Sequence, residues 1–274
     1  MEVTTKDLEY VRDLVRERSA IVLEAEKAYL VNSRLEPLAK SEGFSSLTAL
    51  VGTLRQTSYT SLHKKVVEAL TTNETSFFRD LAPFQALREH ILPEVIKKNT
   101  LMKRLNIWCG ASSSGQEPYS ILLTILEHFP VLKSWRLHFT ATDISQEMLE
   151  RCQEGTYSQL EVNRGLPPAL LTKYFSKKAM GWEIREELRD MIEFREMNLA
   201  GTWLNFPKMD LVFMRNVMIY FDAQTKKQIL QNVRGILEPH GFLFLGSSET
   251  TMNLDDLYER VVVNGTSVYR LKNG

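Results

Sequence analysis

The first seventy residues carry apolar side chains at helical spacing. Positions three or four apart recur in four groups, separated by polar residues and by Gly43: Leu8, Val11, Leu14 and Val15; Tyr29, Leu30, Leu35 and Leu38; Leu47, Leu50, Val51 and Leu54; Leu62, Val66, Val67 and Leu70. Such spacing places the apolar residues on one face of a helix, and no segment here has the alternation of a strand. We therefore predict a small all-α N-terminal domain over residues 1–70.

Strands alternate with helices in the rest of the chain. Apolar runs that end in Gly or Asp predict strands, and amphipathic stretches between them predict helices. The predicted strands are 104–109, 137–142, 191–196, 210–214, 242–245 and 268–271, and the predicted helices are 83–97, 121–129, 146–153 and 225–237. This order is typical of βαβ units, so we predict an α/β, Rossmann-like domain over residues 86–274. Residues 166–189 interrupt the alternation and predict an insert.

A polar segment joins the two predicted domains. Residues 71–76 are rich in hydroxyl side chains, and Phe77, Phe78 and Arg79 come directly after them. This composition is typical of a loop that opens a new domain, and we assign residues 71–85 to a linker. Taken alone, Arg79 would more often be a solvated surface residue than a ligand.

Charge and composition exclude several classes of protein. The 34 basic and 34 acidic residues give a formal net charge of zero, whereas proteins that neutralise phosphates carry a basic excess. The two cysteines, Cys109 and Cys152, lie too far apart in the sequence for a zinc motif. No apolar run approaches the ~18 residues of a membrane span, and residues 1–7 lack the apolar core of a signal peptide. We expect a cytoplasmic protein with no metal, no nucleic-acid partner and no membrane insertion.

The loop after the first predicted strand carries an unexpected carboxylate. Residues 110–120 read Gly-Ala-Ser-Ser-Ser-Gly-Gln-Glu-Pro-Tyr-Ser, which is not the GxGxxG of pyrophosphate-binding loops. Glu117 stands about where a phosphate would lie, so it favours a ligand with a cationic group, such as the ammonium or sulfonium of S-adenosylmethionine. The alternative is a surface acid in the first turn of a helix, stabilised by the helix dipole.

Asp143 comes directly after the second predicted strand. A carboxylate at that position can accept hydrogen bonds from both hydroxyls of a ribose. The alternative is the N-cap of the next helix, but Ser145 is an equally good cap and would leave Asp143 free for a ligand.

Polar residues also end the strand at 210–214. Arg215 and Asn216 come after an apolar run, where burial is costly without partners, and Tyr220 lies just beyond. The preceding strand ends near Asn198, which is placed similarly. Either these side chains bind a ligand, or they form a satisfied structural network.

Four motifs together resemble those of the CheR-type chemoreceptor glutamate O-methyltransferases, and the resemblance covers essentially the whole chain. The motifs are residues 72–79 (TNETSFFR), 111–120, 141–144 (ATDI) and 215–221 (RNVMIYF), of which the last is highly specific. The resemblance implies S-adenosylmethionine as the cofactor, S-adenosylhomocysteine as its product, and a β-subdomain inserted at about residues 171–194. It implies cofactor contacts at Asn73, Thr75, Arg79, Glu117, Asp143, Asn198, Leu199, Arg215 and Asn216. Arg79 and Tyr220 match positions beside the transferred methyl group.

The resemblance also implies a partner, the cytoplasmic domain of a chemoreceptor. Two features depart from the family. The helix expected to meet the acidic receptor has Arg34 and Lys40 separated by Glu36, Pro37 and Leu38, so we expect weaker electrostatic docking. Residues 175–184 are short for the loop that binds a receptor's C-terminal pentapeptide, so we expect no such tether. We expect a monomer.

Three alternatives remain open at this point. The chain could be a regulatory module that binds the cofactor without turnover. It could methylate another signalling protein or a small molecule. It could be a nicotinamide dehydrogenase, against which the missing GxGxxG argues.

Overall fold

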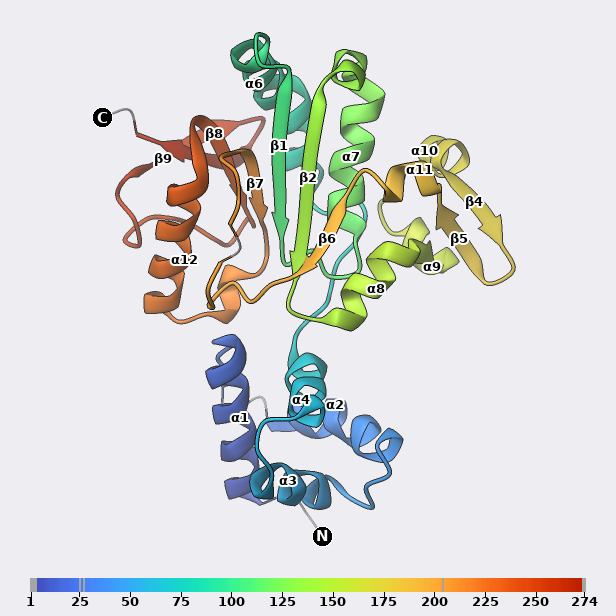
Figure 1. Ribbon diagram of the computed structural model, residues 1–274, viewed down its shortest axis with the longest axis vertical. Helices are drawn as coiled ribbons and strands as arrows, with labels where there is room; N and C mark the ends of the chain where they lie inside the picture. Colours follow the sequence, from blue (N-terminus) through green and yellow to red (C-terminus); the bar gives the residue numbers. More distant parts are fainter. Residues whose placement is uncertain (1–3, 25, 27, 204, 273–274) are drawn as a thin grey trace. The chain divides into compact units, whose positions relative to one another are not determined.

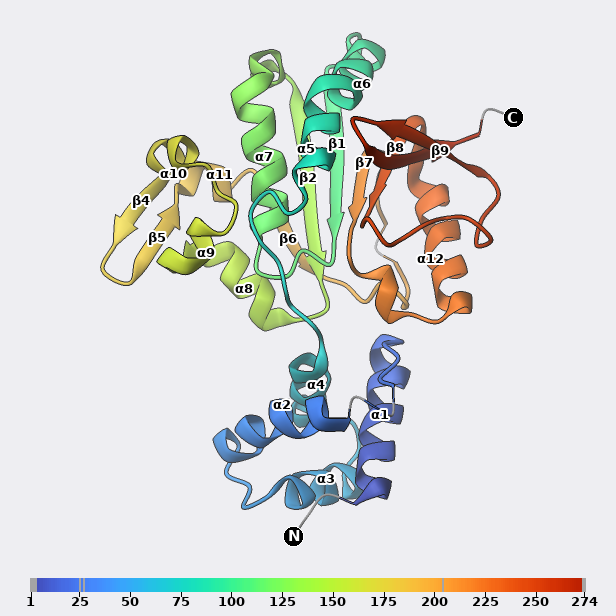
Figure 2. The same ribbon diagram turned by 180° about the vertical axis from the view of Figure 1, so that it is seen from behind.

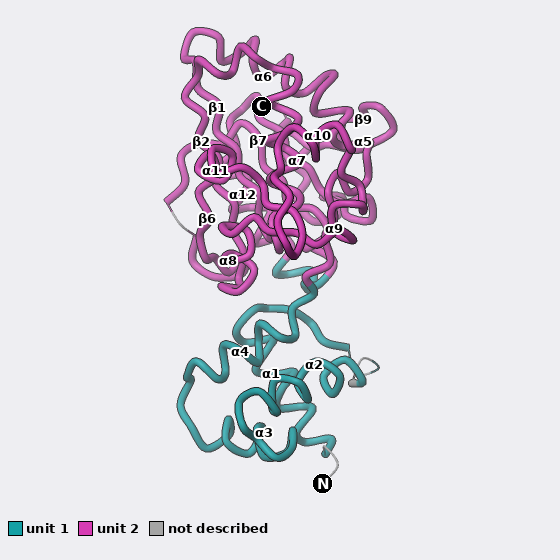
Figure 3. The backbone as a smooth tube through the Cα atoms, turned by 90° about the vertical axis from the view of Figure 1, so that its right-hand side faces the viewer, with its two compact units in different colours: residues 1–72, 220–225 teal, residues 73–219, 226–274 magenta. Residues whose placement is uncertain are grey.

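The computed structural model describes residues 4–24, 26, 28–203 and 205–272. The ends of the two predicted domains, residues 1–3 and 273–274, lie outside the described residues. The chain forms two compact units, which Figure 3 shows in different colours. Residues 1–72 and 220–225 make up the helical unit, and residues 73–219 and 226–274 make up the α/β unit.

The helical unit confirms the all-α prediction. Its helices are α1 (Thr5–Ser19), α2 (Ala28–Ser41), α3 (Leu47–Gln56) and α4 (Ser61–Leu70). Side-chain caps begin two of them: Thr4 accepts from the backbone N–H of Asp7, and Ser46 accepts from that of Ala49. The predicted apolar face forms the core, where Leu35, Leu50 and Leu54 are fully buried.

A short segment from much later in the sequence completes this unit. Residues 220–225 belong to it, and Ile21 forms an isolated antiparallel bridge with Phe221. The backbone N–H of Val22 donates to the carbonyl of Tyr220 at 2.9 Å. Local patterning could not have predicted this pairing, because nearly two hundred residues separate the partners in the sequence.

The α/β unit is built on a seven-stranded sheet with the order β6-β2-β1-β7-β8-β10-β9. The strands are β1 (Arg104–Gly110), β2 (Arg136–Asp143), β6 (Glu193–Glu196), β7 (Met209–Met214), β8 (Leu237–Leu245), β9 (Tyr258–Val263) and β10 (Thr266–Leu271). The first five are parallel, while β10 pairs antiparallel with β8 and with β9. Strands buried on both faces read as continuous apolar runs, which is why the sequence pattern revealed β1, β2 and β7.

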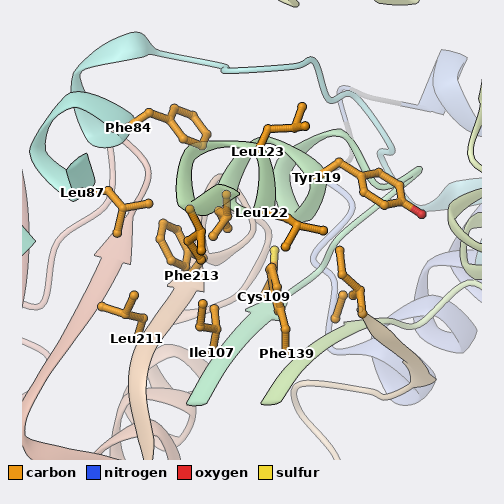
Figure 4. Close-up of a cluster of buried hydrophobic side chains, with 14 of the residues drawn as sticks. Phe84, Leu87, Ile107, Cys109, Tyr119, Leu122, Leu123, Phe139, Leu211 and Phe213 are labelled. Carbon is orange, nitrogen blue, oxygen red and sulfur yellow. The ribbon is translucent and has the colours of Figure 1, made fainter. Parts of the chain in front are cut away.

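Helices cover both faces of the sheet (Figures 1 and 2). They are α5 (Leu81–Ala86), α6 (Leu92–Asn99), α7 (Gln116–His128), α8 (Gln146–Glu154) and α12 (Ala223–Ile236), with a π-helical turn η2 (Leu87–Ile91) between α5 and α6 and 3-10 turns η3 (Pro130–Ser134) and η4 (Met218–Tyr220). Figure 4 shows Phe84 and Leu122 pointing onto the face of the sheet that carries Ile107 and Phe213. All four side chains belong to one buried cluster.

A small antiparallel sheet forms the insert. Its order is β3-β5-β4, from Thr156–Tyr157, Gly181–Ile184 and Phe175–Lys178. Short helices surround it: α9 (Gln159–Asn163), α10 (Pro168–Tyr174) and α11 (Glu186–Arg189). The sheet thus begins before residue 171, because Thr156 pairs with Glu183 and brings the chain that leaves α8 into it.

Two strands differ from the sequence pattern. The predicted strand 242–245 is the end of a longer strand, β8, which starts at Leu237 and contains Pro239 and Gly241. The register with β7 shifts between Met209 and Leu211, opposite this part of β8. Strand β9 was not predicted, because Glu259 and Arg260 leave only a short apolar run in it and, at the edge of the sheet, it exposes the apolar Val262.

Candidate active site

The predicted polar residues gather at the carboxyl ends of the parallel strands. β1 pairs with β2 on one side and with β7 on the other, so the chain order reverses at β1. Open α/β sheets bind ligands at such a switch point.

The backbone of the loop after β1 has an unusual, left-handed conformation at several residues. Ala111, Ser113 and Gly115 have positive φ angles of 56°, 50° and 94°. A Cβ on Gly115 would lie 2.9 Å from the hydroxyl of Tyr157 and 3.1 Å from the sulfur of Cys152. Gly115 is therefore required for both its conformation and its close packing, and α7 begins directly after it.

Asp143 joins this loop to the end of β2. Its Oδ2 accepts from the backbone N–H of Ser113 at 2.8 Å, and its Oδ1 accepts from that of Ser145 at 2.9 Å. Ser145 caps α8, as the sequence predicts, by accepting from the N–H of Met148. Burial raises the pKa of the Asp143 carboxyl, partly opposed by these N–H donors. Each carboxylate oxygen keeps a second lone pair, so the group can still accept from two ribose hydroxyls.

The segment at residues 73–79 lies against the same loop. The Ser113 hydroxyl donates to the carbonyl of Asn73 at 2.8 Å, and the N–H of Phe78 donates to the Ser120 hydroxyl at 2.9 Å. The guanidinium of Arg79 donates to the carbonyl of Glu74 at 2.9 Å. Thr75, in the same segment, is half-buried. The structure thus brings residues 73–79 to the loop after β1.

Arg215 is the most deeply buried ion of the site. Its side chain is 1% exposed, and its Nη1 donates to Oε1 of Glu117 at 2.5 Å. Its Nη2 donates to Oδ2 of Asp80 at 2.9 Å and to the carbonyl of Arg79 at 3.0 Å. Glu117 is thus not a free surface acid. Two carboxylates against one guanidinium leave one negative charge, which suits a cationic ligand.

Asn198 and Leu199 lie just beyond β6. The Asn198 side chain accepts from the N–H of Ala200 at 2.9 Å, and the indole of Trp203 donates to the carbonyl of Leu199 at 2.8 Å. The Leu199 side chain lies 3.5 Å from where a Cβ on Gly110 would stand. Leu199 therefore packs beside the end of β1.

Asn216 is held by a residue that the sequence interpretation missed. It has a positive φ of 60°, and its backbone N–H donates to Oε2 of Glu249 at 2.8 Å. The same oxygen accepts from the N–H of Gly246 at 2.5 Å. Glu249 lies shortly beyond the predicted strand at 242–245, so the rule that polar residues beyond strand ends mark the site could have found it.

Tyr220 belongs to the helical unit, while the other predicted site residues belong to the α/β unit. It is the residue directly after Ile219 in the chain. Its placement beside the transferred methyl stays a prediction from the family resemblance.

Neither cysteine is suited to nucleophilic chemistry. Burial raises the pKa of the Cys109 thiol well above its usual value, and the Glu117 carboxylate raises it further. Burial also raises the pKa of Cys152, whose sulfur donates to the carbonyl of Ser113. Both thiols stay protonated at neutral pH, so neither supplies a thiolate nucleophile.

Fold and site together define a class. A mostly parallel sheet, a buried carboxylate at the end of β2, a group of net negative charge at the end of β7 and a loop unlike those that bind pyrophosphate are features expected of an S-adenosylmethionine-dependent methyltransferase. Family comparison agrees: the CheR methyltransferase S-adenosylmethionine-binding domain matches residues 73–266, and the CheR methyltransferase all-alpha domain matches residues 6–71. The chain belongs to the CheR methyltransferase family.

Full-length relatives carry the same assignment. The chain is 42% identical to chemotaxis protein methyltransferase 1 of Pseudomonas aeruginosa, with 99% of this chain and 100% of the relative covered. It is 40% identical to chemotaxis protein methyltransferase Cher2 of Pseudomonas putida over the same shares, and 39% identical to chemotaxis protein methyltransferase 1 of Vibrio cholerae over 98% and 99%. These findings confirm the predicted family, enzyme class and cofactor, and they exclude the nicotinamide dehydrogenase.

One further finding concerns membranes. Within residues 4–24, 26, 28–203 and 205–272, no helix is both long and apolar enough to span a bilayer.

Proposed function

We propose that this methyltransferase esterifies glutamate side chains on the cytoplasmic domain of a chemoreceptor, in the cytoplasm and as a monomer. The observation that carries the proposal is the full-length match to chemotaxis protein methyltransferases. The buried Asp143 carboxylate at the end of β2 and the net negative Glu117–Arg215–Asp80 group at the end of β7 support it. The match covers 99% of this chain and 100% of each of these two relatives.

For the cofactor, we propose contacts from Asn73, Thr75, Arg79, Glu117, Asp143, Asn198, Leu199, Arg215 and Asn216. Asp143 would accept from the ribose hydroxyls, and the Glu117–Arg215–Asp80 group would balance the cationic part of S-adenosylmethionine. The bound cofactor supplies an electrophilic methyl on a sulfonium. Leu199, beside Gly110, would border the adenine.

The protein's contribution to the reaction would be alignment and desolvation. A glutamate side chain with an ordinary pKa near ~4.3 is already ionised at neutral pH, so no general base is needed. Arg79 would hold the substrate carboxylate, or the carboxylate of the cofactor, by charge-assisted hydrogen bonds, and Tyr220 would orient the attacking oxygen. We expect Arg79→Ala to lower cofactor affinity or turnover, and Tyr220→Phe to lower turnover.

Transfer of labelled methyl to a purified receptor cytoplasmic domain tests the substrate. Glutamyl methyl esters release methanol in mild base, so base-labile label is expected, and it should disappear when the modified glutamates are changed to alanine. Cofactor binding without any transfer would instead favour the regulatory module. Label on a different protein of the cell and none on the receptor would favour another signalling substrate.

We also propose that no C-terminal receptor pentapeptide is needed. Strands β4 and β5 are joined by only Ala179 and Met180, which supports a short β-subdomain loop. Equal methylation of intact and tail-truncated receptors is expected; tight binding of a tail peptide would contradict the proposal.

A separate contact supports the expectation of weaker electrostatic docking. In the helical unit, Arg34 donates to the carbonyls of Leu70 and Thr71 at 3.1 and 2.6 Å, so part of its donor capacity is used within the unit.

A further inference from the structure

Glu249 occupies an unusual position in the α/β unit. Its side chain is buried, with 8% of the residue exposed, and its carboxylate accepts from three backbone N–H groups. Oε2 accepts from Asn216 at 2.8 Å and from Gly246 at 2.5 Å, and Oε1 accepts from Ile219 at 3.3 Å. One carboxylate therefore joins the turn after β7 to the turn after β8.

The turn after β7 depends on this carboxylate for its shape. Asn216 has a φ of 60°, a left-handed conformation that costs free energy for a residue other than glycine. It persists only where surrounding contacts impose it, and the bond from its N–H to Glu249 is such a contact. Ile219, at the other end of the turn, directly precedes Tyr220.

Glu249 is itself held in place. Its backbone N–H donates to the carbonyl of Gly246 at 2.9 Å, and the hydroxyl of Tyr269 donates to its carbonyl at 3.3 Å. A Cβ on Gly246 would lie 2.7 Å from both the Glu249 carboxylate and the Asn216 side-chain nitrogen. The two turns are therefore packed as closely as a glycine allows.

We propose that Glu249 is a positioning residue for methyl transfer: it holds Asn216 in the conformation that binds the cofactor and, through Ile219, sets the start of the segment that carries Tyr220. The inference rests on the proposed roles of Asn216 and Tyr220. Glu249 contacts backbone atoms alone in these bonds, so it acts through the turn and not on the reactants.

The two oxygens of Glu249 have separable tasks, which gives a sharp test. In Glu249→Gln, the amide oxygen can replace Oε2 and keep the bonds from Asn216 and Gly246, while the NH2 group then meets the N–H of Ile219, donor against donor. Glu249→Ala removes all three bonds. The loss of one buried hydrogen bond to a charged group is enough to change an equilibrium constant about tenfold or more.

The experiment measures S-adenosylhomocysteine affinity by calorimetry, turnover with the receptor cytoplasmic domain, and hydrogen–deuterium exchange of a peptide spanning 216–219. We expect Glu249→Gln to keep affinity within about threefold, lower kcat about tenfold and speed exchange in the turn. We expect Glu249→Ala and Gly246→Ala to weaken affinity about tenfold or more. A Glu249→Ala variant that binds with wild-type affinity would overturn the proposal, and so would equal effects of Gln and Ala on affinity.

Asp255 offers a matched control. It is also a buried carboxylate near the C-terminal strands, and it accepts from Arg234 at 3.2 Å and from the N–H of Leu257 at 3.0 Å. Asp255→Asn should lower the melting temperature without changing the affinity for S-adenosylhomocysteine. If it lowered that affinity as much as Glu249→Ala does, Glu249 would only stabilise the fold in general. The affinity and exchange measurements need no receptor, so they test Glu249 even if the wild-type protein does not methylate a chemoreceptor.

Discussion

Arg215 Nη1 lies 2.5 Å from Glu117 Oε1, with the arginine side chain 1% exposed and the glutamate side chain 12% exposed. The pair joins the end of β7 to the first turn of α7. A second carboxylate, Asp80, meets the same guanidinium but is 47% exposed. Arg215 is therefore a structural ion of the site as well as a candidate cofactor contact.

The first prediction concerns this pair. Arg215→Met should lower the free energy of unfolding of the α/β unit by about 3–5 kcal/mol, because it leaves Glu117 buried and uncompensated. The double variant Arg215→Met with Glu117→Gln should recover part of that loss. Urea unfolding followed by tryptophan fluorescence measures it, since all four tryptophans lie in this unit.

Arg270→Ala is the matched control for the Arg215 variants. Arg270 pairs with Glu259 on the β9–β10 hairpin, and both side chains are more than a third exposed. An exposed pair contributes about 0–1 kcal/mol. Equal losses of unfolding free energy from Arg215→Met and Arg270→Ala would show that the buried pair contributes no more to stability than the exposed pair.

The second prediction is a pH dependence of cofactor binding. Burial raises the pKa of Asp143, and ribose hydroxyls would donate to its ionised form. S-adenosylhomocysteine should therefore bind more weakly as the pH falls through the raised pKa, and binding should release protons. Calorimetry across a pH series would detect this, and Asp143→Asn should both weaken binding and flatten the profile. A wild-type affinity that does not change with pH would contradict it.

The same shift sets the direction of a stability effect. A carboxyl whose pKa is higher in the folded state than in the unfolded state contributes most to stability below the unfolded pKa, and this contribution is lost as the pH rises through the folded pKa. The ionised Asp143 thus costs stability at neutral pH. We expect the urea midpoint of wild type to fall as the pH rises through the raised pKa, and we expect Asp143→Asn, which has no titrating group at this position, to lack this pH dependence. A wild-type midpoint that rises over this range relative to that of Asp143→Asn would show that the carboxylate's N–H bonds outweigh its desolvation.

The third prediction concerns Gly165. Its φ is 97°, and an added Cβ would lie 2.0 Å from the carbonyl oxygen of Phe77. Gly165→Ala must therefore displace backbone in the segment that carries Arg79, and we expect a loss of about 2 kcal/mol or more together with weaker cofactor binding.

Gly265→Ala separates crowding from backbone strain. Gly265 has a φ of 75°, and among the described residues no atom lies within 4 Å of an added Cβ. Its substitution therefore reports the conformational cost alone, about 1 kcal/mol. Cofactor affinity should be unchanged in this variant. If Gly165→Ala bound cofactor as tightly as Gly265→Ala, contact with Phe77 would not matter for the site.

The fourth prediction concerns the start of the helical unit. Asp7 accepts from the N–H and the hydroxyl of Thr4 at 3.1 and 2.7 Å and pairs with Arg55 at 3.3 Å. The Thr4 hydroxyl bond, with smaller help from Arg55, lowers the pKa of Asp7. The stability that this provides is present above the unfolded pKa, near ~3.9, and is lost as the pH falls through the lowered folded value.

Asp7→Ala should destabilise α1 by about 1–2 kcal/mol at neutral pH, through loss of the capping box and the ion pair. Hydrogen–deuterium exchange of peptides from α1 measures this directly. The urea midpoint reported by tryptophan fluorescence is an internal control and should stay within error, because no tryptophan lies in the helical unit. Unchanged exchange in α1 would refute the assignment of Asp7.

The sequence predicted the positions of Asp143 and Arg215 at strand ends because the rule is local: an apolar run marks the strand, and the next polar residue marks its carboxyl end. It could not predict what Arg215 contacts. Glu117 lies 98 positions away in the chain, and only the pairing of β1 with β7 brings the two together. A satisfied structural network and a ligand site, which the sequence left as alternatives for Arg215, are therefore compatible in the same side chain.

By itself, the sequence determined the all-α and α/β domains, the main parallel strands and the family. Helical periodicity, buried apolar runs and contiguous motifs reveal them, and all three are properties of neighbouring residues. Only the tertiary structure decided which charges compensate one another, that Thr156–Tyr157 joins the inserted sheet, that residues 220–225 belong with the helical unit, and that Glu249 holds the turn of Asn216. These are contacts between segments far apart in the chain. Their free energy depends on burial and distance in the folded protein, and no local pattern encodes either.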